Sequence, residues 1–279
     1  MRIIAECNST ESEWVLVDKD SIVEKVKTKG FNPFIQSRRE ISHTMRLELP
    51  ESFFKRRWEC VHIYGSGCST SERKKIVELS AVAQFKSPTI VESNLLGAAR
   101  GLLGDKAGIA CILSAGSNSC QYNGSEIEKQ VRSLGFILGD EGSGSSLGRL
   151  LLSDCLKGLL PRGISEAFYD KYNITPEGVL ENIFSNKSVH NWLSQYAVFL
   201  SEHLDDEYVN KLVRDEFKRF FVRNIYQYEY EKYSVNIVGD VACIFEETIR
   251  SVAQELGVEI GNIEVSSIGG LVKYHSQEK

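Results

Sequence analysis

The sequence lacks the features that mark several specialised classes of protein. It contains no apolar run of about 18 residues, the length that a membrane-spanning helix requires, so no transmembrane segment is expected. Met1 and Arg2 lead directly into an apolar strand pattern rather than into the core of a signal peptide, so secretion is not expected. No low-complexity linker divides the chain.

Basic charge and paired cysteines are also scarce. The 33 Lys and Arg against 38 Asp and Glu give a formal net charge of −5, which argues against nucleic acid as the main partner. The short basic stretch FKRRWE, at 54–59, is expected to be a solvated edge. The seven cysteines are odd in number and include no CxxC pair, which disfavours a zinc site and a disulfide framework. We therefore expect reduced thiols in the cytoplasm.

The remaining composition is that of a soluble globular protein. Hydrophobic residues make up 42% of the chain and charged residues 25%, enough for a sizeable core. A length of 279 residues suggests one large domain or two medium ones. In the first third, the patterns predict strands at 2–7, 13–18, 21–27, 60–64 and 88–92, and helices at 37–48, 70–84 and 94–103.

The chain then repeats its opening shape. IIAECNSTESEWVLVD, at 3–18, reads as strand, polar turn and strand, and GIACILSAGSNSCQYNG, at 108–124, has the same form. A helix-rich stretch follows over 143–233, and then a strand at 235–239, one long helix over 240–257 that Gly257 ends, and a short strand at 263–267. The repetition predicts an α/β protein with an internal duplication and a cleft between its halves.

Four stretches of small polar residues and glycine accompany the predicted strand ends. They are YGSGCST at 64–70, LSAGSNSC at 113–120, GFILGDEGSGSSLG at 135–148, and VNIVGD at 235–240, where Asp240 is placed to cap the next helix. Any one of them is an ordinary turn signal. Together they predict one ligand cleft, because open α/β sheets bind their ligands at the strand ends.

Five motifs carry a family resemblance over essentially the whole chain. GFILGDEGSGSSLGR, with FNPF, NLLGAARGL, NSCQYNG and GLVKYH, resembles the N-acetylglucosamine kinase-like branch of the BadF/BadG/BcrA/BcrD ATPases, within the sugar kinase/hsc70/actin superfamily. The resemblance implies two ribonuclease-H-like lobes with an actin-like ATPase fold, one at 1–105 completed by 266–279 and one at 106–265. It also implies ATP, Mg²⁺, an amino sugar such as N-acetylglucosamine, and a homodimer.

The resemblance assigns the nucleotide side to two hairpins and an adenosine-side motif. These nucleotide positions are Glu6, Asn8, Ser9, Thr10, Ser12, Ala115, Gly116, Ser117, Gly239 and Asp240. Glu6 is also the candidate metal ligand.

This side departs from the family pattern. Glu6, Asn8 and Glu11 stand where active members carry Asp, Gly and Lys, and the second hairpin begins Ser114-Ala115 instead of Gly-Thr. Glu11 reverses the charge expected beside a phosphate. Asn8 can adopt the left-handed conformation that a glycine would take, which would preserve the backbone of the turn.

The catalytic position departs too. Asn94, in VESNLLGAAR, matches the aspartate that acts as base towards the sugar hydroxyl. An amide has no usable basicity, and loss of a general base costs on the order of 10²–10⁴ in rate. Glu92, two residues earlier, is the candidate replacement.

The sugar side keeps the family residues. Asn32, Gly135, Asp140 and Glu141 match sugar-binding positions, and short acids and amides suit hydroxyl groups because they supply both acceptors and donors. The alternatives are structural: Asp140 as a helix cap and Asn32 as a turn residue before Pro33. His62, His190 and His203 are expected to be structural as well, and the aromatic stripe over 217–224 to be core or a dimer face.

Two functions of different class follow. The first is an ATP-dependent amino-sugar kinase. The second is a catalytically impaired relative, a pseudokinase that binds sugar or a protein partner without efficient transfer. An ATPase that drives another process is a third and weaker hypothesis, because no cysteine pair suited to a cluster at a subunit interface is seen.

Overall fold

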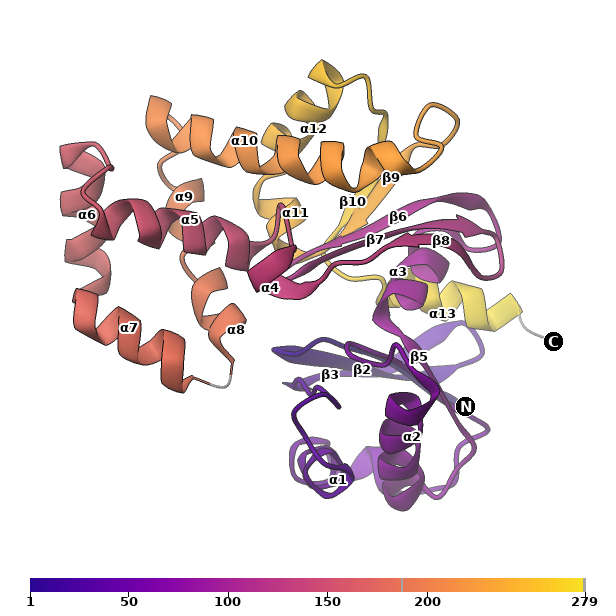
Figure 1. The fold of residues 1–279 in the computed structure, drawn as a ribbon. Coiled ribbons are helices and arrows are strands. Elements are labelled where there is room, and N and C mark those ends of the chain that lie inside the picture. Colours follow the sequence, from indigo (N-terminus) through magenta and orange to yellow (C-terminus); the bar gives the residue numbers. More distant parts are fainter. Residues whose placement is uncertain (187, 278–279) are drawn as a thin grey trace. The chain divides into compact units, whose positions relative to one another are not determined.

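A computed structural model describes residues 1–186 and 188–277, and the chain in it divides into two compact units (Figure 1). Unit 1 comprises Met1–Ala110, Tyr122–Glu128 and the segment that starts at Ser266, and unit 2 comprises Cys111–Gln121 and Lys129–Val265. None of the helices described is both long enough and apolar enough to cross a membrane.

Unit 1 is built on a five-stranded sheet of order β3-β2-β1-β4-β5. Its strands are β1 (Arg2–Cys7), β2 (Glu11–Asp18), β3 (Ser21–Lys29), β4 (Val61–Gly65) and β5 (Thr89–Ser93). β1 pairs antiparallel with β2 and parallel with β4, which in turn runs parallel to β5. In this register Cys7 lies opposite Gly65, and Gly65 opposite Ser93, so the segments that follow the three parallel strands leave the same edge of the sheet.

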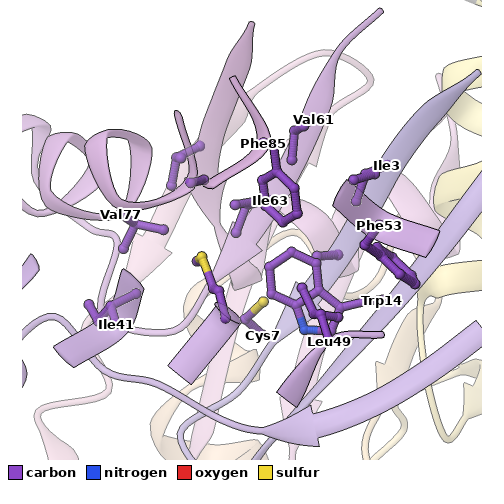
Figure 2. Close-up of a cluster of buried hydrophobic side chains, with 14 of the residues drawn as sticks. Ile3, Cys7, Trp14, Ile41, Leu49, Phe53, Val61, Ile63, Val77 and Phe85 are labelled. Atoms are coloured by element: carbon purple, nitrogen blue, oxygen red, sulfur yellow. The ribbon is translucent and has the colours of Figure 1, made fainter. Parts of the chain in front are cut away.

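Helices cover both faces of this sheet. α1 (Arg38–Glu48) and α2 (Ser71–Phe85) pack on one face, over a core that includes Ile3, Trp14 and Phe85 and is shown in Figure 2. α3 (Asn94–Leu103) and α13 (Ile268–Gln277) pack together on the other. α3 and α13 approach closely because both carry glycine at the crossing: a Cβ on Gly270 would lie 1.8 Å from the carbonyl oxygen of Gly101.

The second sheet has the order β10-β9-β6-β7-β8. Its strands are β6 (Ala107–Leu113), β7 (Ser117–Asn123), β8 (Ile127–Val131), β9 (Val235–Val238) and β10 (Ile260–Glu264). The helices of unit 2 are α4 (Gly135–Leu138), α5 (Gly144–Leu156), α6 (Arg162–Tyr172), α7 (Pro176–Ser185), α8 (Val189–Ser194), α9 (Ala197–Ser201), α10 (Glu207–Arg223), α11 (Asp240–Ile244) and α12 (Glu246–Glu255).

The α/β class is confirmed, and so are the elements predicted for the first hundred residues. The prediction of a single helix over 240–257 is wrong, because Phe245 interrupts it and separates α11 from α12. The ring of Phe245 is buried, with its centroid 5.6 Å from that of Phe217. Gly257 ends α12 with a left-handed φ of 69°, as predicted. The aromatic stripe over 217–224 is core, since Phe217, Phe220 and Phe221 are all fully buried.

Candidate functional site

The first polar turn joins β1 to β2 at the edge where the parallel strands of unit 1 end. The backbone N–H of Asn8 donates to the carbonyl of Glu11 at 2.9 Å, and that of Gly30 donates to Thr10 at 2.9 Å. A Cβ on Gly30 would lie 2.2 Å from the carbonyl oxygen of Asn8, so only glycine fits against the turn. Asn8 does not use the left-handed conformation that is open to an asparagine: its φ is not positive, and the Asn8–Glu11 pair closes the turn without it.

Glu11 points along the sheet, towards the neighbouring strand. Its carboxylate lies 2.6 Å from the Lys27 ammonium on β3, and its side chain is 53% exposed. The hydrogen bond from Lys27 accounts for the raised pKa of that lysine. The reversed charge that the sequence places at this turn is therefore neutralised at the surface.

Glu6, the last acidic side chain before the turn, is buried and fastens the start of α13. Its Oε2 accepts hydrogen bonds from Ser267 N–H at 2.9 Å and from the Ser266 hydroxyl at 3.1 Å. Ser266 also donates to Glu13, which lies directly opposite Glu6 across β1 and β2. Burial raises the pKa of Glu6, and the charge of Glu13 raises it further, against the lowering by the two serines.

This environment bears on the predicted metal site. The described residues contain no group of three or more His, Cys, Asp or Glu that could hold a metal ion. Mg²⁺ in phosphate-binding sites typically keeps several waters and uses one or two carboxylates beside the substrate phosphates. Glu6 is one carboxylate, the number that such a site can use beside a nucleotide.

Asn94 is the first residue of α3, after the N-cap Ser93, whose hydroxyl accepts from Leu96 N–H. The amide nitrogen of Asn94 donates to Asn8 Oδ1 at 3.4 Å, so the structure brings the predicted base position to the first turn. Glu92 forms an ion pair with Lys74 of α2, and both side chains are about one third exposed or less. The Glu92 carboxylate is therefore already engaged in an ion pair.

Asn32 holds its own turn. Its Oδ1 accepts from Phe34 N–H at 2.9 Å, and its backbone carbonyl accepts from Ile35 and Gln36. A Cβ on Gly67 would lie 2.6 Å from that Oδ1, so the loop after β4 packs directly on Asn32. The turn-residue interpretation is confirmed, and the side-chain NH₂ of Asn32 is the group left to donate to a ligand.

The second polar turn, Ser114 to Ser117, lies in unit 2 between β6 and β7. Ser114 N–H donates to Gly116, and the N–H groups that begin α5 donate back into the turn, Gly144 to Ser114 at 2.8 Å and Ser145 to Ala115 at 3.1 Å. The turn and the segment that begins α5 are therefore held together as one structure.

Asp140 lies beside this turn in a left-handed conformation, with a φ of 58°. Its Oδ1 accepts from Ser117 N–H at 3.4 Å, and a Cβ on Gly116 would lie 3.3 Å from its Oδ2. The cap interpretation of Asp140 is wrong, because Ser143 caps α5 by accepting from Ser146 N–H.

Burial gives Asp140 unusual acid–base behaviour. Asp140 is only 7% exposed. This desolvation, with a smaller contribution from the charge of Glu141, raises the pKa of Asp140 to about 6. The hydrogen bond from Ser117 N–H acts in the opposite direction and lowers the pKa. A buried carboxyl group that titrates near neutrality is more common in functional sites than elsewhere.

The neighbouring acid has a structural partner. Glu141 is buried, and its Oε1 lies 2.5 Å from Arg223 Nε at the end of α10. The sequence reasoning missed a further acid on that helix: Glu216, 1% exposed, accepts from Gly142 N–H at 3.1 Å and from the Ser146 hydroxyl at 2.5 Å. The sequence feature that could have indicated Glu216 is an acidic residue within the apolar stripe of α10.

The adenosine-side motif also reaches this part of unit 2. Gly239 has a φ of 139°, and a Cβ there would lie 2.0 Å from the carbonyl oxygen of Leu113, the last residue of β6. Asp240 is the first residue of α11 and makes no capping hydrogen bond, so the predicted cap is wrong. Gly135, in contrast, has open space around its Cβ position. Ser12 is completely buried, opposite Cys7 in the strand register.

Comparison with known proteins decides the family. No protein-family model and no curated protein matches the chain. Among solved structures, a proposed N-acetylglucosamine kinase from Porphyromonas gingivalis is 34% identical, with 100% of this chain and 99% of that chain covered and a TM-score of 0.95. The chain belongs to the N-acetylglucosamine kinase-like family. The resemblance drawn from the motifs is thereby confirmed.

More distant structures show the same fold. A proposed N-acetylglucosamine kinase from Chromobacterium violaceum has 14% identity and a TM-score of 0.74, with 98% of each chain covered. A ROK family glucokinase from Streptomyces griseus, solved with glucose and AMPPNP, has 12% identity and a TM-score of 0.56, over 98% of this chain and 97% of that one. This N-acetylglucosamine kinase-like protein therefore has the actin-like ATPase fold of the sugar kinases.

Proposed function

We propose that this protein binds an amino sugar such as N-acetylglucosamine and transfers the γ-phosphoryl group of ATP to it. The observation that carries the proposal is Asp140: a buried carboxyl group with a pKa of about 6, held beside the small-residue turn Ser114–Ser117 in a family member. A carboxylate in such surroundings gains strongly from new hydrogen-bond donors, and sugar hydroxyl groups are such donors. The kinship with the P. gingivalis protein supports the choice of sugar.

Transfer of a phosphoryl group depends mainly on positioning and on stabilisation of negative charge. The second turn suits the phosphates because Ala115, Gly116 and Ser117 are small enough for the backbone to approach a ligand. In unit 1, Ser9 and Thr10 form the tip of the first turn and carry hydroxyl groups. Mg²⁺, brought with ATP, would neutralise phosphate charge near Glu6.

The proposed reaction needs a group that accepts the proton of the sugar hydroxyl. The sugar oxygen forms a bond to the γ-phosphorus, the bond to the ADP oxygen breaks, and the hydroxyl proton must leave. Asn94 cannot accept that proton, and Glu92 is paired with Lys74. These two observations favour a second candidate function, sugar binding with little transfer.

Binding calorimetry with N-acetylglucosamine tests the proposal, using the wild type, Asp140→Asn, and Asp170→Asn as a matched control on the exposed face of α6. We expect binding by the wild type and the control, and a loss of affinity of tenfold or more in Asp140→Asn, because one hydrogen bond to a charged group contributes about 1.5–3 kcal/mol. Equal affinity in all three proteins would contradict the role of Asp140. Absence of binding by the wild type would contradict the proposed function itself.

The cytoplasmic location and the homodimer remain predictions.

A further inference from the structure

A buried pair of histidines fastens the last helix, α13, to the sheet of unit 1. His62 on β4 and His275 on α13 are both buried, and their ring centroids lie 3.8 Å apart. On the same strand, the Tyr64 hydroxyl lies 2.9 Å from His275 Nε2 and accepts a hydrogen bond from Arg100 of α3 at 3.1 Å. Two imidazolium ions at such a separation would repel each other, so the pair cannot hold two protons without cost.

The charges that act on His62 are all positive. Burial is the largest cause of its lowered pKa, and the charges of His275, Arg2 and Arg100 lower the pKa further, to about 3. No carboxylate is among these groups. A proton on His62 would therefore be desolvated without a counter-ion while α13 stays in place.

α13 also holds the acid at the end of β1. Its ten residues start just after Ser266 and Ser267, which donate hydrogen bonds to Glu6 Oε2. Isolated helices shorter than about 12–15 residues are marginal in water, so α13 depends on its packing against α3, β1 and β2 (Figure 1). Loss of the contact at His275 would therefore weaken the hold on Glu6 as well.

We propose that the His62–His275 pair is an acid-sensitive clasp, whose protonation releases α13 from the sheet and frees Glu6 from its two serine donors while α1 and α2 stay folded. The clasp is a conformational control that goes beyond the proposed function, and its test does not require that a sugar binds.

The other titratable groups around α13 determine how the clasp must be tested. These groups are Arg2 and Glu6 of β1, Glu13 of β2, His62 and Tyr64 of β4, Arg100 of α3, and Lys273, Tyr274 and His275 of α13 itself. Burial raises the pKa of Glu6, so this carboxyl group favours the docked helix in acid and opposes the histidines. Variants at position 62 separate the two effects, because Glu6 titrates in all of them.

Hydrogen exchange of the whole chain, followed by mass spectrometry at pH 7.5 and pH 5, tests the clasp. Protection is expressed relative to an unstructured peptide at the same pH, which removes the intrinsic dependence of exchange on pH. The variant His62→Phe keeps a ring against His275 but binds no proton, and His62→Gln is a second uncharged variant in case the larger ring disturbs the packing. The matched control is His43→Phe, at an exposed histidine on α1.

The expected difference follows from the two pKa values of His62. The released helix leaves this residue with a pKa near 6.5, against about 3 when α13 is docked, so release takes up a proton below pH 6.5. Between pH 7.5 and pH 5, α13 in the wild type and in His43→Phe should therefore lose about 30-fold more protection than α13 in His62→Phe or His62→Gln.

Comparison with α1 and α2 distinguishes local release from global unfolding. The unfolded chain takes up the same proton, so these two helices also lose protection in acid, but α13 should exchange at least about tenfold faster than they do at pH 5. Equal protection of all three helices at both pH values would overturn the clasp, because α13 would then open only with the rest of unit 1. The same acid loss in α13 of the wild type and of both His62 variants would also overturn it.

Discussion

Asp140 is predicted to lower the stability of the protein at neutral pH, because its carboxyl group is buried beside the second turn. Its pKa rises from 3.8 to about 6 on folding, chiefly through burial. The folded state therefore binds the carboxyl proton more tightly than the unfolded chain, and stability falls as the pH rises between these two values. A tenfold change in an equilibrium constant corresponds to about 1.4 kcal/mol, so the cost above pH 6 is about 3 kcal/mol.

Asp140→Asn should recover most of this free energy. The amide is neutral at every pH, asparagine tolerates the left-handed conformation at this position, and its Oδ1 can still accept from Ser117 N–H. We expect the variant to be about 1–3 kcal/mol more stable than the wild type at pH 7.5, and the difference to vanish near pH 4, where the carboxyl group of the folded wild type is protonated.

Urea unfolding of the two proteins at pH 7.5 and pH 4 measures the difference. Asp170→Asn is the control, because an exposed carboxylate on α6 should leave the free energy of unfolding nearly unchanged. Asp140→Asn should also lose affinity for N-acetylglucosamine, so its stability and its sugar binding change in opposite directions. An Asp140→Asn protein that is less stable than the wild type at pH 7.5 would refute the reasoning, since burial would then not be the dominant effect on this carboxyl group.

Three further predictions concern other parts of the chain. Burial lowers the pKa of His62 to about 3, so its contribution to stability is present above pH 6.5 and is lost as the pH falls towards 3. When unfolding is measured against pH, His62→Phe should lose less stability in acid than the wild type. Gly30→Ala should weaken binding of Mg-ATP and lower the melting temperature, because the added Cβ would lie 2.2 Å from the Asn8 carbonyl, whereas Gly163→Ala, with nothing within 4 Å, should do neither. N-Ethylmaleimide should label Cys60 and Cys243 first, as read by mass spectrometry, and early labelling of buried Cys7 or Cys111 would contradict their raised pKa values and burial.

The sequence predicted the fold well where the signal was local. Apolar periodicity and turn residues located the strands around Cys7 and the helix that starts at Asn94 nearly to the residue. The break at Phe245 could not be predicted in this way, because it depends on the contact between Phe245 and Phe217 in a different helix. The short strand β8 was missed for a similar reason, since Ile127–Val131 is mostly polar and exposed and is held by pairing rather than by burial.

The site was predicted by position but not by environment. The motifs named Glu6, Asp140 and Asn94, yet their partners lie far along the chain: Glu6 bonds Ser267 at a separation of 261 residues, and Asn94 bonds Asn8 at a separation of 86. Burial of Asp140 and the pairing of Glu11 with Lys27 likewise follow from tertiary structure. Residue types indicated which chemistry to look for, and the contacts decide which side chains are free to perform it.

Phosphoryl transfer to an amino sugar is tested most directly by observing the product. Wild-type protein would be incubated with Mg-ATP and N-acetylglucosamine, and phosphorylated sugar would be detected by phosphorus NMR, with Asp140→Asn as the parallel sample. We predict that a sugar phosphate forms slowly with the wild type and is lost with the variant. Sugar that binds to the wild type but stays unphosphorylated after prolonged incubation would contradict the kinase function and leave the protein a sugar-binding relative.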